Sequence, residues 1–360
     1  MSVDLASLGW DHHFASLYRP YAYPCQRPAR VSRVDRGACV VLGADGATRA
    51  SIGGALLASA GHDPVRLPCA GDWVVVRHWP DERRTVEAVL TRRTAIVRAS
   101  AGAESTAQVL AANVDVAAVV APVDPEPDIG MVERLVSLAW ASGARPVVLL
   151  TKADLAADPG SIAMEVAEAA PGVDVLPISA ARGSGIEAVR GLVPPGTTLG
   201  LIGPSGSGKS TLVNRLVGAT VMRTQEIRRA DGRGRHTTTH RALVPLPGGG
   251  VVLDAPGIRS VGLTGYGGEA GTVALDRTFA DIDDLAAGCR FGDCTHTSEP
   301  ACAVLAALAA GELAPRRLAS WRKLQREIEY ETRRRHARLT RANRRRWTEP
   351  FGRPGGWTAR

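Results

Sequence analysis

One stretch of nine residues limits what this chain can fold into more than any other. The sequence from Gly203 to Thr211 reads Gly-Pro-Ser-Gly-Ser-Gly-Lys-Ser-Thr, which fits the phosphate-loop pattern of Gly, four residues, then Gly-Lys-Ser/Thr. The apolar run 199–202 before it reads as a buried strand, and 211–217 after it reads as a helix. This order places backbone amides and the positive end of the helix dipole around phosphate. The stretch therefore predicts a nucleotide site, and the alternative is a Gly-rich turn without a ligand.

The residues of this loop have different predicted tasks. Gly206 and Gly208 allow the backbone conformations in which amides converge on phosphate oxygens. Lys209 can reach the β- and γ-phosphates and is a catalytic candidate, while the Ser210 hydroxyl can bind Mg²⁺. The residues predicted to contact the nucleotide are Gly203, Pro204, Ser205, Gly206, Ser207, Gly208, Lys209, Ser210 and Thr211.

A second motif, Thr151-Lys152-Ala153-Asp154, follows the apolar run 146–150 and is close to the Asn-Lys-x-Asp guanine motif of GTPases. The Asp154 carboxylate can accept from N1–H and from the 2-amino group of guanine, donors that adenine lacks there. Leaving a buried carboxylate unpaired costs on the order of 1 to 3 kcal/mol. Thr151 in place of Asn loses an amide that would tie neighbouring loops together, so we expect a somewhat lower base affinity.

The next apolar run, 173–178, ends at Ser179 and Ala180, where a backbone amide can meet guanine O6. This second element strengthens the guanine interpretation, because four residues alone are a weak signal. The alternative is a strand-end turn with a helix cap. The residues predicted to bind the base are Thr151, Lys152, Asp154, Ser179 and Ala180.

Two segments further along resemble the switch segments of GTPases. The apolar run 251–253 leads into Asp254-Ala255-Pro256-Gly257, in which Asp254 suits a water-mediated Mg²⁺ ligand and the Gly257 amide suits the γ-phosphate. Between the phosphate loop and this run lies a polar stretch, 232–239, that ends in three threonines. Of these threonines we expect Thr238 to bind Mg²⁺, and we also take Thr238 as a catalytic candidate.

The residue that follows Gly257 bears on how hydrolysis is triggered. Many GTPases place a Gln there to orient the attacking water, but this chain has Ile258, whose side chain forms no hydrogen bond. Another group must therefore position the water, and His236, just before the switch threonines, is our catalytic candidate. The alternative is that His236 is only a solvated loop residue.

The order of these motifs is unusual. In most GTPases the phosphate loop comes first and the guanine motif late, whereas here the guanine motifs precede the phosphate loop. We therefore predict a circularly permuted GTPase domain of α/β class. Helix-like stretches such as 131–140 and 162–169 alternate with the apolar runs, which is typical of a parallel sheet covered on both faces.

The rest of the chain indicates further domains. Short β-rich runs between 28 and 99 predict a small barrel of about five strands, with the oligonucleotide-binding (OB) fold as leading candidate. A purely structural β-domain is the alternative, because no row of exposed aromatics marks a base-stacking face. The predicted divisions are an irregular lead-in at 1–27, an OB-like β-barrel at 28–99, the permuted GTPase domain at 106–268, a helical zinc-binding domain with a basic helix at 269–347 and a tail at 348–360.

Four metal-ligand residues, Cys289, Cys294, His296 and Cys302, stand within 14 residues of one another. Three thiolates and one imidazole complete a tetrahedral zinc set. Because no coordination position stays open, we expect one structural Zn²⁺. Buried thiols without a metal are the alternative.

The positive charge of the chain is local. Residues 316–346 hold 13 of the 44 Lys and Arg residues against only three Glu, although the whole chain carries a net charge of only +8. Such a cluster favours a partner with phosphates, and the alternative is a solvated charged helix. No apolar run reaches 18 residues and the N-terminus shows no secretory pattern, so we expect a cytoplasmic protein without a membrane segment.

Taken together, these features resemble the ribosome small-subunit-dependent GTPases of the RsgA/YjeQ type. The resemblance covers about residues 28–345 and rests on the permuted motifs, the stretch 234–239, the stretch 254–257 and the spacing of the Cys/Cys/His/Cys set. It implies a monomeric GTPase that binds the 30S subunit and 16S rRNA during late assembly and leaves after hydrolysis, with His236 on a mobile first switch. Departures from the pattern are Thr151, Ser207 and the Arg-rich C-terminus.

Two other functions were weighed. A transporter ATPase or nucleotide kinase shares the phosphate loop, but the chain lacks a Leu-Ser-Gly-Gly-Gln signature and an Asp-Glu pair after 251–253, and a kinase would not need the zinc set. An RNA-binding zinc protein that holds a guanine nucleotide as a structural or regulatory ligand, with little turnover, stays open. Multiple-turnover phosphate release with and without 30S subunits would separate it from a GTPase.

Overall fold

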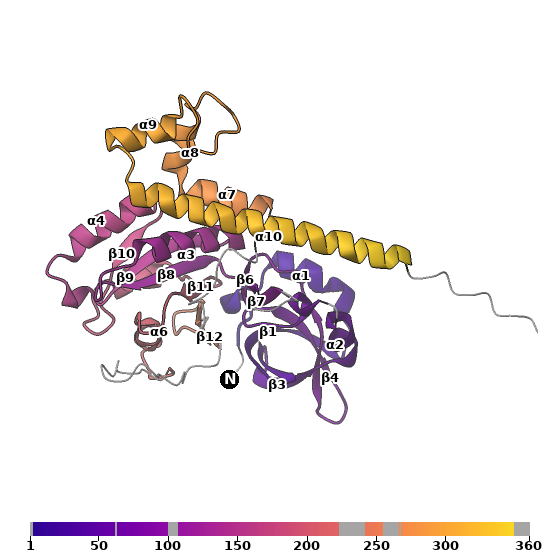
Figure 1. Ribbon diagram of the computed structural model, residues 1–360. Coiled ribbons are helices and arrows are strands. Elements are labelled where there is room, and N and C mark those ends of the chain that lie inside the picture. Colours follow the sequence, from indigo (N-terminus) through magenta and orange to yellow (C-terminus); the bar gives the residue numbers. More distant parts are fainter. Residues whose placement is uncertain are drawn as a thin grey trace, which may run out of the picture.

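The computed structural model describes residues 3–61, 63–99, 107–222, 242–254, 266 and 268–348. It contains a small β-barrel, a six-stranded sheet with helices on both faces and a C-terminal group of helices (Figure 1). Within the described residues, no helix is long and apolar enough to cross a membrane.

The barrel closes with five strands in the order β1-β2-β3-β5-β4, which confirms the predicted barrel. Its interior is filled by small apolar side chains such as Ala29, Val41 and Val74, which suit the narrow space inside five strands. The strands and helices of this part are β1 (Gln26–Asp35), β2 (Ala38–Gly43), β3 (Gly46–Ile52), α2 (Gly54–Ala60), η3 (Pro64–Arg66), β4 (Trp73–His78) and β5 (Arg84–Val89).

The N-terminal segment, predicted from the sequence to be irregular, contains η1 (Ala6–Leu8), α1 (His12–Tyr18) and η2 (Arg19–Tyr21). The Asp11 carboxylate caps α1 by accepting from the amides of His13 and Phe14. Trp10 and Phe14 pack against Trp73 of the barrel, with ring centroids 4.8 and 5.8 Å away. A helix of seven residues is too short to show periodicity, and it owes its stability to this aromatic packing.

The six-stranded sheet has the order β10-β9-β8-β11-β13-β12, and all its pairs are parallel except β12 with β13. The strands are β8 (Val116–Pro122), β9 (Arg145–Thr151), β10 (Val175–Pro177), β11 (Thr198–Ile202), β12 (Ala242–Pro245) and β13 (Val251–Asp254). A separate two-stranded sheet, β6 (Ala95–Ala99) with β7 (Ala107–Ala112), follows the barrel in the chain.

Helices cover both faces of the sheet, as the sequence predicts. On one face lie α3 (Ile129–Ser142) and α4 (Pro159–Ala169), and on the other α5 (Ile186–Gly191) and α6 (Lys209–Val217). The short η4 (Ala153–Leu155) follows β9. Because the central strands are buried from both sides, β8 and residues 199–202 of β11 form continuous apolar runs rather than alternating patterns.

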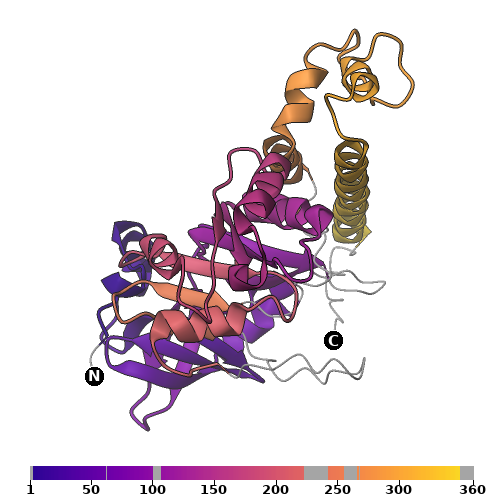
Figure 2. The ribbon, with the colours of Figure 1, turned by 90° about the vertical axis from the view of Figure 1, so that its left-hand side faces the viewer.

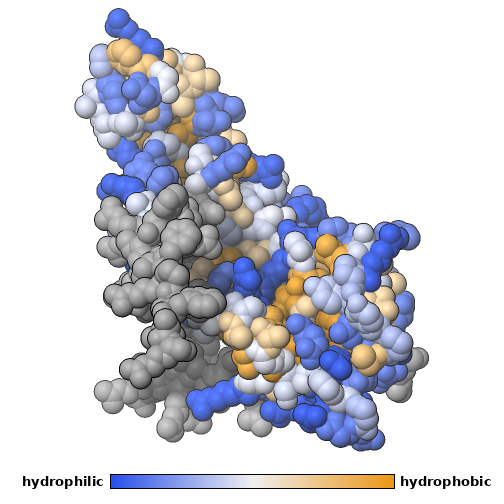
Figure 3. Space-filling model, turned by 90° about the vertical axis from the view of Figure 1, so that its right-hand side faces the viewer, coloured by the Kyte–Doolittle hydropathy of each residue, from blue (hydrophilic) through white to orange (hydrophobic). Residues whose placement is uncertain are grey.

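The C-terminal part consists of α7 (Glu269–Thr278), α8 (Ala280–Ala286), α9 (Ala303–Ala310) and α10 (Pro315–Thr348). Figures 1 and 2 show α8 and α9 projecting away from the sheet, while α10 runs along α3 and α7 and continues past them. The core of this C-terminal part includes Phe279, Leu318, Leu324 and Ile328. In Figure 3 this part stands above the barrel, on whose visible face apolar side chains gather.

Candidate nucleotide site and metal centre

The predicted phosphate loop connects β11 to α6, as its sequence context requires. Gly203, Gly206 and Gly208 all have positive φ, at 154°, 78° and 92°. At Gly203 a side chain is also excluded sterically, because a Cβ atom would lie 2.4 Å from the carbonyl oxygen of Val120. The loop thus takes a backbone path that only glycine allows at these positions.

Lys209 begins α6 and lies inside the loop. Its ammonium donates to the carbonyl oxygens of Gly203 at 2.9 Å and Pro204 at 2.6 Å, and it lies 3.4 Å from the Ser207 hydroxyl. Only 9% of Lys209 is exposed. A phosphate that enters the loop would therefore exchange oxygen ligands around a cation already in place.

Asp254 ends β13, next to the phosphate loop, and is only 2% exposed. Its Oδ1 has no hydrogen-bond partner among the described residues. Burial raises the pKa of Asp254, while the nearby Lys209 ammonium lowers it. A buried carboxylate oxygen without a partner is costly unless a cation compensates it, so this site fits a divalent ion near the phosphates.

The first guanine loop is tied directly to the phosphate loop. The Thr151 hydroxyl donates to the carbonyl oxygen of Ser207 at 2.6 Å and lies 3.4 Å from that of Ala121. A buried hydroxyl therefore connects the two loops in place of the Asn amide, and the somewhat lower base affinity stays a prediction. Lys152 extends the same contact region, since its ammonium donates to the carbonyl oxygen of Asp124 at 2.9 Å.

The second guanine loop lies beside the first. The Ala153 amide donates to the carbonyl oxygen of Ile178 at 3.1 Å, which brings Asp154 into the same region as Ser179 and Ala180. Asp154 is exposed, whereas Ser179 is fully buried. All these loops follow the carboxyl ends of parallel strands, the edge where open α/β sheets bind ligands.

Several predicted residues lie outside the described residues. They are His236, Thr237, Thr238, Thr239, Ala255, Pro256, Gly257 and Ile258.

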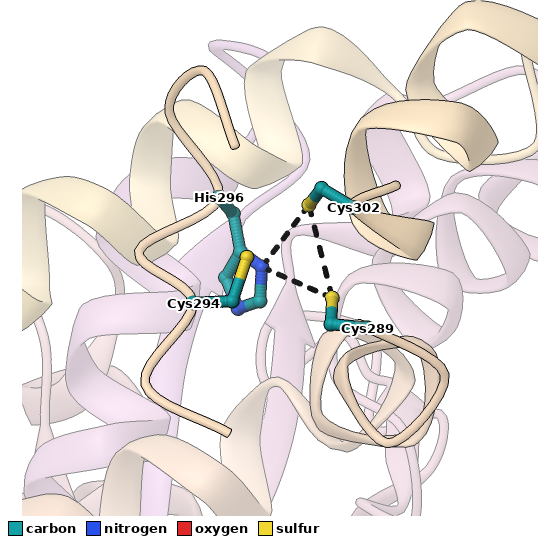
Figure 4. Close-up of side chains that lie close together, drawn as sticks. All are labelled: Cys289, Cys294, His296 and Cys302. Atoms are coloured by element: carbon teal, nitrogen blue, oxygen red, sulfur yellow. Dashed lines mark hydrogen bonds between the residues drawn. The ribbon is translucent and has the colours of Figure 1, made fainter. Parts of the chain in front are cut away.

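The four predicted metal ligands meet, and their ligand atoms all lie within 4.8 Å of one another (Figure 4). The His296 Nδ1 atom is 3.6 Å from Cys289 Sγ and 3.4 Å from Cys302 Sγ, and the two sulfurs are 3.7 Å apart. Zinc bonds of about 2.0 to 2.3 Å in a tetrahedron require ligand separations of about 3.6 to 3.8 Å. The separations among Cys289, His296 and Cys302 are close to these values, and Cys294 completes a cluster that could hold a metal ion such as zinc.

Neighbouring groups orient the cluster, and the sequence motif alone did not indicate them. The Arg322 guanidinium donates to the carbonyl oxygen of His296, and the Trp321 ring lies 5.4 Å from the imidazole. The Glu299 carboxylate accepts from the amides of Thr295 and Thr297, both at 2.8 Å, and so shapes the ligand loop. Amides at the start of α9 lower the pKa of Cys289 despite the opposing effect of burial.

A buried ion-pair network joins α10 to the sheet layer. Arg317, whose side chain is only 4% exposed, contacts Glu133 of α3 at 2.9 Å and Asp281 of α8 at 2.6 Å. Its guanidinium also donates to the carbonyl oxygens of Ala169 and Thr278. The sequence places Arg317 in a basic surface, whereas the structure places it in the interior.

The loops, the buried carboxylate and the position of the guanine motifs ahead of the phosphate loop define a phosphate-loop nucleotide-binding protein with permuted chain order. The RsgA GTPase family profile matches residues 89–264. The small ribosomal subunit biogenesis GTPase RsgA of Streptomyces coelicolor is 50% identical over 326 residues, covering 90% of this chain and 86% of that protein. That of Opitutus terrae is 44% identical over 358 residues, covering 97% and 96%. This chain belongs to the RsgA GTPase family.

Two solved structures share the fold. YjeQ from Thermotoga maritima superposes with a TM-score of 0.58 at 24% identity, over 84% of this chain and 98% of that one. YloQ, described as a circularly permuted GTPase, gives a TM-score of 0.58 at 23% identity, over 86% and 97%. The predicted circular permutation is confirmed.

Proposed function

We propose that this protein hydrolyses GTP on the 30S ribosomal subunit during late assembly and leaves after hydrolysis. The observation that carries the proposal is the meeting of three features at one sheet edge: a phosphate loop, a guanine loop tied to it through Thr151, and the unpartnered carboxylate of Asp254. The names of the relatives in Streptomyces and Opitutus support the ribosomal role.

Each nucleotide contact has a proposed residue. Asp154 accepts from the guanine base, with Ser179 and Ala180 beside it, and Lys209 holds the phosphates. Ser210 and Asp254 hold Mg²⁺, together with Thr238, and the ion when bound would supply positive charge for the phosphates. Gly257 and His236 act on the γ-phosphate and the attacking water. Cys289, Cys294, His296 and Cys302 hold one structural Zn²⁺.

We assign the contact with 16S rRNA mainly to the outer face of α10. Exposed residues recur on it at intervals of seven, three, four and three, which places them along one side of the helix. They are Arg316, Lys323, Arg326, Tyr330 and Arg333. This spacing fits a row of phosphates, with the Tyr330 ring, 53% exposed, available for stacking.

The barrel offers a second basic surface. At the turn between β4 and β5, the guanidinium groups of Arg77 and Arg83 lie 3.9 and 5.4 Å from the centre of the Trp79 ring. This cluster combines positive charge with an aromatic surface, so we include it in the RNA contact.

The decisive experiment measures multiple-turnover phosphate release with and without purified 30S subunits. We expect slow release alone and strong stimulation by the subunit, because the nucleotide site would be completed only on docking. Bound GTP with negligible release under both conditions would instead support a protein that holds the nucleotide as a regulatory ligand.

Base specificity has a separate test. In Asp154→Asn, a double acceptor becomes a carboxamide with one carbonyl acceptor and one NH₂ donor, so preference should move from GTP toward XTP. Asp158→Asn is a matched control, because Asp158 caps α4 and is outside the proposed site. An unchanged ratio of GTP to XTP affinity in Asp154→Asn would show that Asp154 does not read the base.

A further inference from the structure

Strand β1 of the barrel carries an irregularity that faces the nucleotide-binding sheet. Val31 pairs with Val41 and Arg33 pairs with Val40, so Ser32 has no partner on β2. Such a β-bulge turns a side chain away from its regular direction. The Ser32 hydroxyl donates to the carbonyl oxygen of Leu243, in β12, at 2.8 Å. The bulge therefore joins the barrel to the edge strand of the sheet.

A second contact lies on β6, in the two-stranded sheet that follows the barrel. Tyr266, only 8% exposed, donates its hydroxyl to the carbonyl oxygen of Ala95 at 2.6 Å and accepts from the amide of Val97 at 2.7 Å. One side chain thus satisfies two backbone groups of a strand, as a neighbouring strand would. This contact also lies at a bulge, because the pairing of β6 with β7 shifts register between Ile96 and Val97.

Arg30 adds a rigid connection on the same barrel strand. It is 1% exposed, and its guanidinium donates to the carbonyl oxygen of Asn113 at 3.0 Å and to the Thr198 hydroxyl at 2.8 Å. Thr198 is the first residue of β11, which leads into the phosphate loop. The orientation of the barrel is therefore fixed against the strand that carries the loop.

Both contacts lie only a few residues from the nucleotide site, either across paired strands or along the chain. Leu243 pairs with Leu253, the neighbour of Asp254, across β12 and β13. Along the chain, Leu243 follows Thr239 by four residues, and Tyr266 follows Gly257 by nine. Both contacts thus hold the chain just downstream of residues assigned to the γ-phosphate and Mg²⁺.

We propose that Ser32 and Tyr266 are positioning residues that couple the barrel to the nucleotide site. Ser32 holds Leu243 on the barrel itself, whereas Tyr266 holds β6 of the two-stranded sheet, and β7 of that sheet is joined to the barrel part because the Ala112 amide donates to the carbonyl oxygen of Ala70 at 3.0 Å. A barrel held on a partner surface therefore fixes the chain on the downstream side of both predicted switch segments. The effect on subunit-stimulated turnover rests on the proposed function, whereas the coupling itself does not.

The kinetic test uses Ser32→Ala and Tyr266→Phe in the full chain. Turnover without subunits and the half-saturating 30S concentration should stay within about twofold of wild type, and maximal stimulated turnover should fall about three- to tenfold, as expected for one lost hydrogen bond. Ser32→Thr keeps the hydroxyl and should restore stimulation.

Matched controls remove similar bonds elsewhere. Ser59→Ala loses a 2.8 Å bond to the carbonyl oxygen of Leu56 within α2, and Tyr18→Phe loses a 2.9 Å bond to that of Gln26. Both should keep full stimulation. Wild-type stimulation in Ser32→Ala and Tyr266→Phe, or an equal loss in the controls, would overturn the proposal.

A second measurement needs no ribosome. Amide hydrogen exchange of β1 is compared between protein bound to GDP and protein bound to a nonhydrolysable GTP analogue. Exchange should differ between the two nucleotides in the wild type, and this difference should be lost in Ser32→Ala and Tyr266→Phe. If 30S subunits do not stimulate turnover of the wild type, but its β1 exchange differs between the two nucleotides, the ribosomal function is refuted and the coupling is supported. No difference in the wild type, or an equal one in the variants, would refute the coupling.

Discussion

Both halves of α10 are rich in basic residues, but the folded chain uses these residues differently. In the first half Leu318, Leu324 and Ile328 are buried, and Arg317 is enclosed by carboxylates. In the second half, the described side chains from Arg333 to Thr340 are exposed or half-buried. The number of basic residues in the sequence therefore overstates the positive charge that a partner can contact. In the first half, Arg317 is buried in an ion pair that stabilises the fold.

This difference also decides how α10 can be tested. Removal of the whole helix would delete core residues together with surface arginines, and the two effects could not be separated. Single substitutions in each half separate stability from binding.

The largest effect is expected for Arg317→Met. Removing the buried partner leaves the Glu133 carboxylate, whose side chain is 1% exposed, with only the half-exposed Arg316 at 3.4 Å as a counter-charge, and breaking a buried ion pair in this way costs about 3 to 5 kcal/mol. Urea unfolding should show this loss. Arg316→Met is the matched control, since the Arg316 side chain is 47% exposed and only 3.4 Å from the same carboxylate, and it should cost less than about 1 kcal/mol. Equal losses in the two variants would contradict the burial argument.

An intermediate effect is expected for Arg322→Ala, which removes the contact with the carbonyl oxygen of His296. Groups that orient metal ligands typically contribute about 10- to 100-fold to metal affinity. Competition with a chelator should show such a loss of Zn²⁺ affinity. Arg326→Ala, one turn further along α10, should bind zinc like the wild type, and the prediction fails if both variants lose zinc equally.

The smallest effect on the fold is expected for Arg333→Gln in the second half. Unfolding should be unchanged, because the side chain is exposed and, among the described residues, donates only to the carbonyl oxygen of Glu329 within its own helix. Binding to 30S subunits should weaken, and its logarithmic salt dependence should decrease by about 0.7 to 0.9 for one lost phosphate contact. An unchanged slope would make this half a solvated helix face.

The same contrast explains what the sequence could predict. The phosphate loop, the guanine motifs and the Cys/Cys/His/Cys set are each recognised from residues a few positions apart in the sequence. Their positions in the fold could be predicted because the loops follow the ends of predicted strands. Arg317 and Glu133 stand 184 residues apart, and no local pattern links them. The bulge at Ser32 and the helix at 12–18 also depend on distant packing partners, so periodicity does not reveal them.

Thr151 is an intermediate case. Its place in the motif was clear from the sequence, but the consequence of having no Asn there was not. A hydroxyl can make the loop contact only if the two loops approach closely, and the 2.6 Å distance to Ser207 records that approach.

The length of α10 has a consequence for which RNA can be recognised. A helix of 34 residues spans about 51 Å and does not bend freely, so the spacing of its outward arginines is fixed before any partner arrives. A short flexible RNA strand can bind some of these arginines through its phosphates. It loses conformational entropy when it is ordered along the remaining arginines. A folded RNA whose phosphates already match the spacing loses little. Under the proposed RNA contacts, α10 would therefore distinguish a correctly assembled rRNA surface from an unfolded one by distance alone, without reading any base.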